Sequence, residues 1–195
     1  GLTVNGAEVA GGFVQRMADE VGMSPIAIQN TNAKSTDLTL TTFGVPTGAV
    51  TASGYGYSIT RRYFTPEGTP VEGPVAQGTR LVVVLDVAPS EEVGGRLMID
   101  DPLPAGLEID NPHLISSGEM SDMPWLETTY AEHAEFRSER FLAQVNRTGT
   151  NPFRLAYVVR AITPGEYHHP AASVADMYRP QYNAHTASGR FIVTP

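Results

Sequence analysis

The sequence predicts an all-β protein: an antiparallel β-sandwich of immunoglobulin-like architecture, preceded by a partial β-module and with little helix. About seven short segments are rich in β-branched and aromatic residues, which favour strands. The 19 glycines and 15 prolines are spread between these segments as turn signals rather than gathered in one linker. Hydrophobic residues make up 41% of the chain and charged residues 17%, a balance that supports a packed core.

The first part of the chain predicts a small module. Apolar residues recur at roughly helical spacing over residues 9–21, which predicts one short helix weakened by a Gly-Gly pair. Residues 26–30 and 38–46 predict two strands joined as a hairpin, and the second run alternates apolar and polar residues. The Gly-, Thr- and Ser-rich stretch at residues 47–56 predicts the boundary of this module.

The strands of the predicted sandwich follow that boundary. Residues 79–87 are apolar on both faces, so we expect this strand at the centre of a sheet. Residues 134–146 carry many charges and are ambiguous, but a turn signal directly after them favours a single strand. The other predicted strands lie at residues 57–64, 96–100, 155–162 and 189–194.

Charge and composition exclude several classes of function. A formal net charge of −8 argues against nucleic acid and against an anionic membrane surface as partners. The chain has no cysteine, which excludes disulfides, thiol nucleophiles and cysteine-bound zinc. No apolar run approaches the ~20 residues of a membrane span. The start at Gly1, directly followed by a β-rich run, leads us to expect a piece of a longer protein.

Candidate metal and catalytic groups are weak. His168 and His169 are neighbours, and neighbours on a strand point to opposite faces, so on a strand they would not converge on a site with His185 and Asp176. In a Pro-flanked loop they could, but nothing in the sequence fixes the spacing. The acidic residues Asp100, Asp101, Glu108 and Asp110 lack a calcium-loop pattern. We therefore expect no metal, no cofactor and no enzyme activity. An enzyme would need a convergent polar cleft around the three histidines.

Unlike these polar candidates, Met177 and Tyr178 are large apolar neighbours placed just before Arg179-Pro180. One interpretation is that they fill the core between two sheets. Strand alternation sends neighbours to opposite faces, so at a strand end one or both can instead project outward as a contact for another module. Composition and periodicity leave both interpretations open.

Four segments in series carry a family resemblance. LPAGLEIDNP at residues 103–112, EFRSERF at 135–141, YVVRAITPG at 157–165 and MYRP at 177–180 together resemble the C-terminal, macroglobulin-like domain of bacterial alpha-2-macroglobulins. NTN at residues 30–32 and FGVP at 43–46 resemble the part of a CUB domain that follows the thioester domain in that family. The resemblance implies the C-terminal half of a CUB-like domain at residues 1–52 and a macroglobulin-like β-sandwich at 53–195.

The resemblance also implies a function. Family members are periplasmic protease traps, often anchored to the inner membrane by an N-terminal lipid. Cleavage of a bait region exposes an internal thioester that captures the protease. By resemblance, Met177 and Tyr178 shield that thioester, with Pro164, Gly165, Arg179 and Pro180 supporting their geometry. The implied partners are the thioester domain of the parent chain and the target proteases.

The alternative is a stand-alone immunoglobulin-like module that binds a surface ligand. It predicts that Met177 and Tyr178 are buried in the core of this chain. The shielding role predicts that at least Tyr178 is exposed to solvent when the thioester domain is absent.

Overall fold

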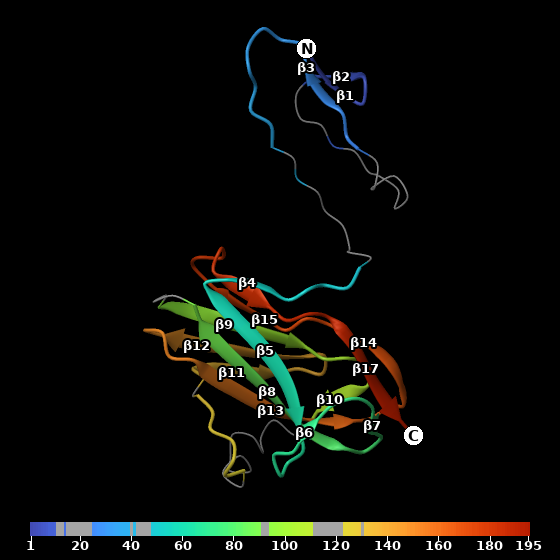
Figure 1. The fold of residues 1–195 in the computed structure, drawn as a ribbon, viewed down its shortest axis with the longest axis vertical. Helices are drawn as coiled ribbons and strands as arrows, with labels where there is room; N and C mark the ends of the chain where they lie inside the picture. The colour runs from blue at the N-terminus through green and yellow to red at the C-terminus, as the bar shows by residue number, and fades with distance from the viewer. Residues whose placement is uncertain are drawn as a thin grey trace. The chain divides into compact units, whose positions relative to one another are not determined.

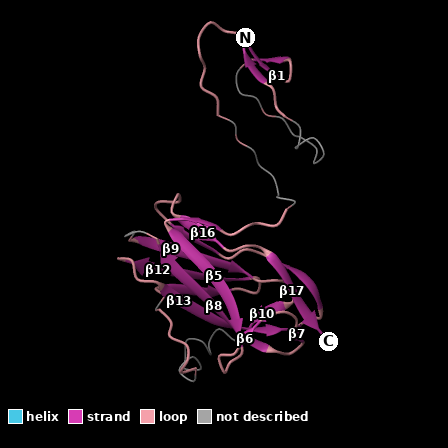
Figure 2. Cartoon of the chain, in the orientation of Figure 1, coloured by secondary structure: helices cyan, strands magenta, loops and turns pink. Residues whose placement is uncertain are grey.

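A computed structural model describes residues 1–10, 14, 25–39, 41, 48–90, 94–110, 123–129 and 131–195. The chain divides into two compact units, Gly1–Val45 and Pro46–Pro195. Strands dominate the described residues, and no helix occurs among them (Figures 1 and 2). The helix expected at residues 9–21 falls almost wholly outside the described residues. Assignment of the first unit to a CUB domain stays a prediction.

The first unit contains a small antiparallel sheet with the order β2-β1-β3, formed by Leu2–Val4 (β1), Ala7–Val9 (β2) and Ile28–Asn30 (β3). Asn5 and Gly6 connect β1 to β2 with φ values of 49° and 81°, the left-handed pair that a tight two-residue hairpin requires.

Strand β3 pairs with β1, and the hairpin expected between residues 26–30 and 38–46 stays a prediction. Residues 38, 39 and 41 lie in a loop, and the rest of that predicted strand falls outside the described residues. The side chain of Asn30 accounts for the chain leaving the sheet here. It donates to the Lys34 carbonyl and accepts from the Asn32 amide, which fixes a turn directly after β3.

The second unit is an antiparallel β-sandwich, as the sequence predicts. One sheet has five strands in the order β10-β13-β8-β5-β6, and the other has six in the order β11-β12-β9-β15-β16-β4. The five-stranded sheet consists of Tyr57–Phe64 (β5), Pro70–Val71 (β6), Arg80–Pro89 (β8), Leu107–Ile109 (β10) and Phe153–Ala161 (β13). The six-stranded sheet consists of Ser53–Tyr55 (β4), Gly95–Pro102 (β9), His133–Phe136 (β11), Arg140–Arg147 (β12), Ser173–Asp176 (β15) and Asn183–His185 (β16).

Strand β8 lies at the centre of its sheet, between β13 and β5, which confirms the expectation drawn from its two apolar faces. Leu81, Val83 and alternate residues beyond them point into the main core between the sheets. Val82 and Val84 point to the opposite face, where Met123, Leu126 and Trp125 pack over them, so both faces of the strand are covered. This burial explains the continuous apolar run in the sequence.

A third, small sheet lies beside the sandwich and has the order β14-β17-β7. It consists of Val75–Ala76 (β7), Gly165–His169 (β14) and Gly189–Thr194 (β17), and β17 pairs with β7 in parallel. Phe191 and Val193 of β17 reach the main core. In Figure 1 this sheet carries the C-terminus.

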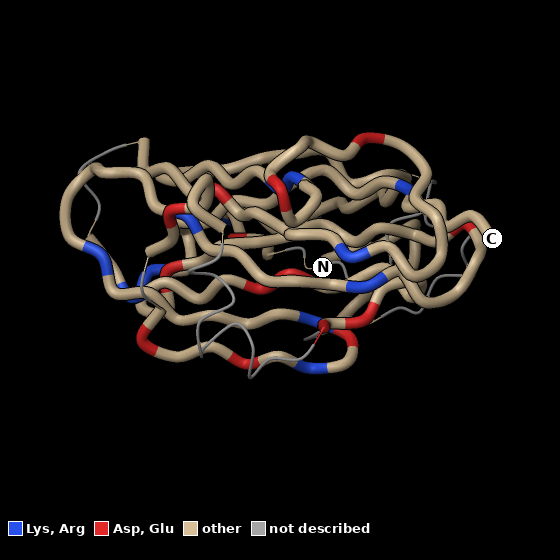
Figure 3. The backbone as a smooth tube through the Cα atoms, turned by 90° about the horizontal axis from the view of Figure 1, so that it is seen from below, with Lys and Arg blue, Asp and Glu red and all other residues tan. Residues whose placement is uncertain are grey.

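The single strand expected at residues 134–146 is instead a hairpin of β11 and β12. Arg137, Ser138 and Glu139 form its turn, and the Arg137 amide donates to the Arg140 carbonyl at 2.9 Å. The polar residues in the middle of residues 134–146 therefore form a turn at which the chain reverses direction. Acidic and basic residues are interspersed along the strands (Figure 3), and none of the described segments is a helix of the length and apolarity that a bilayer crossing needs.

Candidate functional site

The β15–β16 turn, residues 177–182, is the feature that stands out chemically. Strand β15 pairs with β9 on one side and β16 on the other, and the chain leaves the sheet after Asp176. Beyond that point Met177 is 46% exposed and Tyr178 is 74% exposed. The core interpretation of this pair is therefore wrong, because the strand ends one residue earlier and both side chains face solvent. Exposure is the arrangement that the shielding role requires.

Asp176 and Arg179 form a clamp beneath this exposed pair. One oxygen of the Asp176 carboxylate, Oδ1, accepts from the backbone amides of Tyr178 at 2.9 Å and Arg179 at 3.1 Å. The other, Oδ2, accepts from Nε and Nη2 of the Arg179 guanidinium at 3.0 and 2.7 Å. Burial raises the pKa of Asp176, but these hydrogen bonds and the Arg179 charge outweigh it and lower the pKa below its usual range.

Three further backbone hydrogen bonds close the turn. The Met177 amide donates to the Arg96 carbonyl at 2.9 Å, and the Asp176 amide donates to the Tyr182 carbonyl at 3.0 Å. The Tyr182 amide in turn donates to the Arg179 carbonyl at 2.9 Å. The exposed pair therefore sits on a backbone tied at both ends rather than on a loose loop.

A row of stacked side chains continues from the turn to the edge of the sheet. The Arg179 guanidinium lies 5.0 Å from the centre of the Tyr182 ring, and that ring stacks on Tyr55 of β4 at 5.3 Å. Tyr55 is itself exposed. Gly56 permits this packing, because a Cβ at that position would lie 2.3 Å from the Tyr182 ring. The row of Arg179, Tyr182 and Tyr55 thus begins in the turn that carries the exposed pair and ends at the exposed ring of Tyr55.

The remaining residues expected to support this geometry fall in two places. The Pro180 carbonyl accepts from the Asn183 side chain at 2.8 Å, within the β15–β16 turn. Gly165 begins β14 in the third sheet, and Pro164 directly precedes it. There the Tyr167 hydroxyl donates to the Pro164 carbonyl at 3.2 Å, and the Tyr167 ring lies against Gly165. Within the described part of the chain, the contacts of Pro164 and Gly165 belong to β14 and not to the turn.

The histidines do not form a site. His168 and His169 alternate on β14, with His168 exposed and His169 buried. His169 Nε2 lies 2.8 Å from the Tyr63 hydroxyl, and burial lowers the pKa of His169 from 6.5 to about 3. No group of three metal-ligating side chains occurs among the residues that the structure describes. An open pocket of about 260 Å³ is lined by Glu108, Ile109, Phe136, Arg137 and Ser138, none of them a histidine.

Arginines pair with the three aspartates among the acidic residues that a calcium site would use. Asp101 is buried and bound by Arg61 at 2.5 Å, and Asp110 is bound by Arg80 at 2.6 Å. Asp100 pairs with Arg140 at 3.1 Å.

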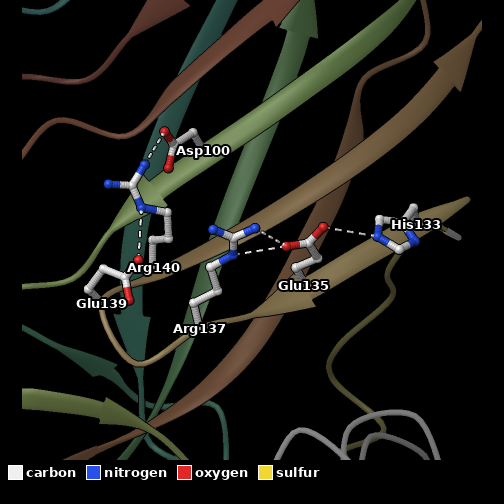
Figure 4. Close-up of polar contacts among 6 residues, drawn as sticks. All are labelled: Asp100, His133, Glu135, Arg137, Glu139 and Arg140. Carbon is white, nitrogen blue, oxygen red and sulfur yellow. Dashed lines mark hydrogen bonds and ion pairs between the residues drawn. The ribbon is translucent and has the colours of Figure 1, made fainter.

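Figure 4 shows the pair of Asp100 and Arg140 beside the linked side chains of His133, Glu135 and Arg137 on the hairpin of β11 and β12. The carboxylates of this face are therefore parts of ion pairs on a solvated surface.

Two packed sheets with an exposed, clamped apolar turn define a β-sandwich domain with exposed apolar side chains at one end. Residues 56–181 match the family described as "Bacterial Alpha-2-macroglobulin MG10 domain". The chain thus belongs to the bacterial alpha-2-macroglobulin family.

Curated and solved relatives agree with this assignment. An alpha-2-macroglobulin of Xylella fastidiosa (strain 9a5c) is 36% identical over 146 residues, which are 70% of this chain and 9% of that protein. Salmonella alpha-2-macroglobulin reacted with methylamine is 32% identical with a TM-score of 0.69, covering 78% of this chain and 10% of that one. Trypsin-activated alpha-2-macroglobulin from Escherichia coli is 32% identical with a TM-score of 0.66, covering 78% and 11%. The chain therefore spans about a tenth of the length of these relatives.

Proposed function

We propose that this chain is the domain of a bacterial alpha-2-macroglobulin that shields the thioester of the neighbouring thioester domain until the bait region is cleaved. One observation carries the proposal. Met177 and Tyr178 are large apolar side chains that face solvent on a backbone fixed by the Asp176–Arg179 clamp. A side chain of this kind is suited to cover a reactive group on a separate domain.

The chemistry of a thioester supports this role. Water and amines attack a thioester whenever they reach it, so its protection requires an apolar cover that excludes them. The cover must also leave after bait cleavage, which favours a small interface at one end of a domain over a continuous core. This chain has no cysteine, so the thioester belongs to another part of the parent protein.

The relatives support the same class of activity. The Salmonella protein is described as reacted with methylamine, a small amine nucleophile, and the Escherichia coli protein as activated by trypsin. We extend this to the parent of the present chain as a protease inhibitor whose partners are its own thioester domain and target proteases. We further propose a periplasmic location, with the parent held at the inner membrane by an N-terminal lipid.

The test uses the full-length parent with Tyr178→Ala, and the rate of methylamine incorporation before any protease is added. We expect faster incorporation than in the wild type, because amines reach the uncovered thioester. Ile192→Ala is the matched control, since Ile192 is an exposed apolar residue on β17 of the third sheet. Equal incorporation by wild type and Tyr178→Ala would refute the shielding role.

A further inference from the structure

Asp176 is a buried carboxylate whose partner arginine is partly exposed. Its side chain is only 1% exposed, while the Arg179 side chain that binds it is 41% exposed. The four hydrogen bonds to its two oxygens go to the backbone of Tyr178 and to the backbone and side chain of Arg179. Every one of these contacts fixes the segment that carries the exposed apolar pair.

The site for this carboxylate is built by a distant strand. A Cβ at Gly95 of β9 would lie 2.4 Å from Oδ2 of Asp176, so only glycine leaves room there for the carboxylate. The Arg179 guanidinium also donates to the Gly94 carbonyl, directly before β9. The clamp therefore anchors the turn to the sheet as well as closing it locally. Among the described residues, Tyr57 of β5 and Tyr182 of the turn are titratable groups near the clamp; burial raises the pKa of Tyr57, the Asp176 charge adds to this rise and the Arg179 charge opposes it.

We propose that Asp176 is the positioning residue of the shield: its carboxylate holds the Tyr178 backbone and draws Arg179 back against Tyr182. This inference rests on the proposed function and names the residue on which the shield depends. An exposed side chain that must dock gains from a fixed backbone, since less conformational freedom is lost on contact. Without the carboxylate, the amides of Tyr178 and Arg179 lose their acceptor and the Arg179 guanidinium loses its ion pair.

The first experiment measures methylamine incorporation by the uncleaved full-length parent carrying Asp176→Ala. We expect an increase of about tenfold, the factor expected when hydrogen bonds to a charged group are lost. Asp176→Asn keeps an oxygen for the two amides but loses the ion pair, so its rate should be intermediate. Adding Asp176→Ala to Tyr178→Ala should produce little further increase, because both changes remove the same cover.

Asp86→Ala is the matched control. Asp86 also binds two arginines, Arg62 at 2.5 Å and Arg154 at 2.7 Å, but it lies on β8 of the other sheet. Its loss should leave incorporation unchanged. If Tyr178→Ala incorporates methylamine faster than the wild type and Asp176→Ala does not, the positioning role alone is overturned. Equal increases for Asp86→Ala and Asp176→Ala would also overturn it, since general destabilisation would then account for both.

A second experiment decides the positioning role even if Tyr178→Ala has no effect on incorporation. It follows hydrogen exchange at the amides of Tyr178 and Arg179 in the 195-residue chain. We expect Asp176→Ala to accelerate exchange at both amides by about tenfold, while amides of β8 and β13 keep their protection. Unchanged exchange at both amides would overturn the proposal.

Discussion

The guanidinium of Arg61 on β5 and the carboxylate of Asp101 on β9 meet at 2.5 Å between the two sheets, with side chains only 5% and 0% exposed. The other carboxylate oxygen accepts from the Tyr157 hydroxyl at 2.7 Å, and Arg61 also donates to the Pro170 carbonyl at 2.7 Å. A buried ion pair of this kind fixes how the sheets face each other, provided that its remaining hydrogen bonds are made.

Removing one partner of this pair should be costly. We expect Asp101→Ala to lower the free energy of unfolding by about 3–5 kcal/mol, because Arg61 is left as an unpaired buried charge. Urea unfolding of the chain measures this loss. The control is Glu166→Ala, whose partner Arg190 forms an ion pair with both side chains exposed, and we expect a change below about 1 kcal/mol. A loss at Asp101 no larger than at Glu166 would show that the buried pair contributes little.

Gly56 allows a test of the stacked row. Its φ of 74° is left-handed, and a Cβ there would lie 2.3 Å from the Tyr182 ring. Gly73 has a similar φ of 83°, but nothing lies within 4 Å of its Cβ position. Gly56→Ala should therefore cost about 1–3 kcal/mol more than Gly73→Ala, since both carry backbone strain but only the first displaces a ring. Equal losses of stability for the two variants in thermal unfolding would mean that the Tyr182 ring moves aside without cost.

His169 predicts a specific pH dependence. The unfolded chain binds a proton at this histidine near 6.5, whereas burial lowers the pKa of the folded group to about 3. Between these values the unfolded state binds more protons, so stability falls as pH drops from 6.5 toward 3, by at most about 1.4 kcal/mol per pH unit. Urea unfolding across this range should show a steeper slope in the wild type than in His169→Phe. Identical slopes would contradict the buried neutral state.

The long strands were predictable because each is long enough to show its pattern. Tyr57–Phe64 alternates clearly, and Arg80–Pro89 is apolar on both faces. The strands of only two or three residues, such as β6, β7 and β10, are too short to show any period and depend on pairing with distant strands. Strands β14 and β15, of five and four residues, were not predicted either; they lie on either side of Pro170 and belong to different sheets.

Arg61 shows what alternation can still reveal. It shares the inner face of its strand with Tyr57, Ile59 and Tyr63, whereas its neighbour Arg62 points outward to Asp86. The sequence contained this distinction, although the two arginines look equivalent as a charged pair. Its partner Asp101 was not predictable, since that contact depends on which strands face each other.

The site was predictable only in part. The MYRP motif singles out Met177 and Tyr178, and the structure adds that both are exposed. Asp176 is two residues before Tyr178 and fits an Asx-turn, but from the sequence we considered it only as a metal ligand. Its pairing with Arg179 in a space left by Gly95 depends on a strand far away in the chain, so no local pattern indicates it.

The shielding role is tested most directly by a photo-crosslinking amino acid placed at position 178 of the full-length parent, with position 192 as control. Both wild-type residues are exposed and apolar, but Ile192 lies on β17 of the third sheet. We expect position 178 to link to the peptide carrying the thioester in the uncleaved protein, and trypsin treatment to abolish the link. A link no stronger than that from position 192, or one unchanged by trypsin, would contradict it.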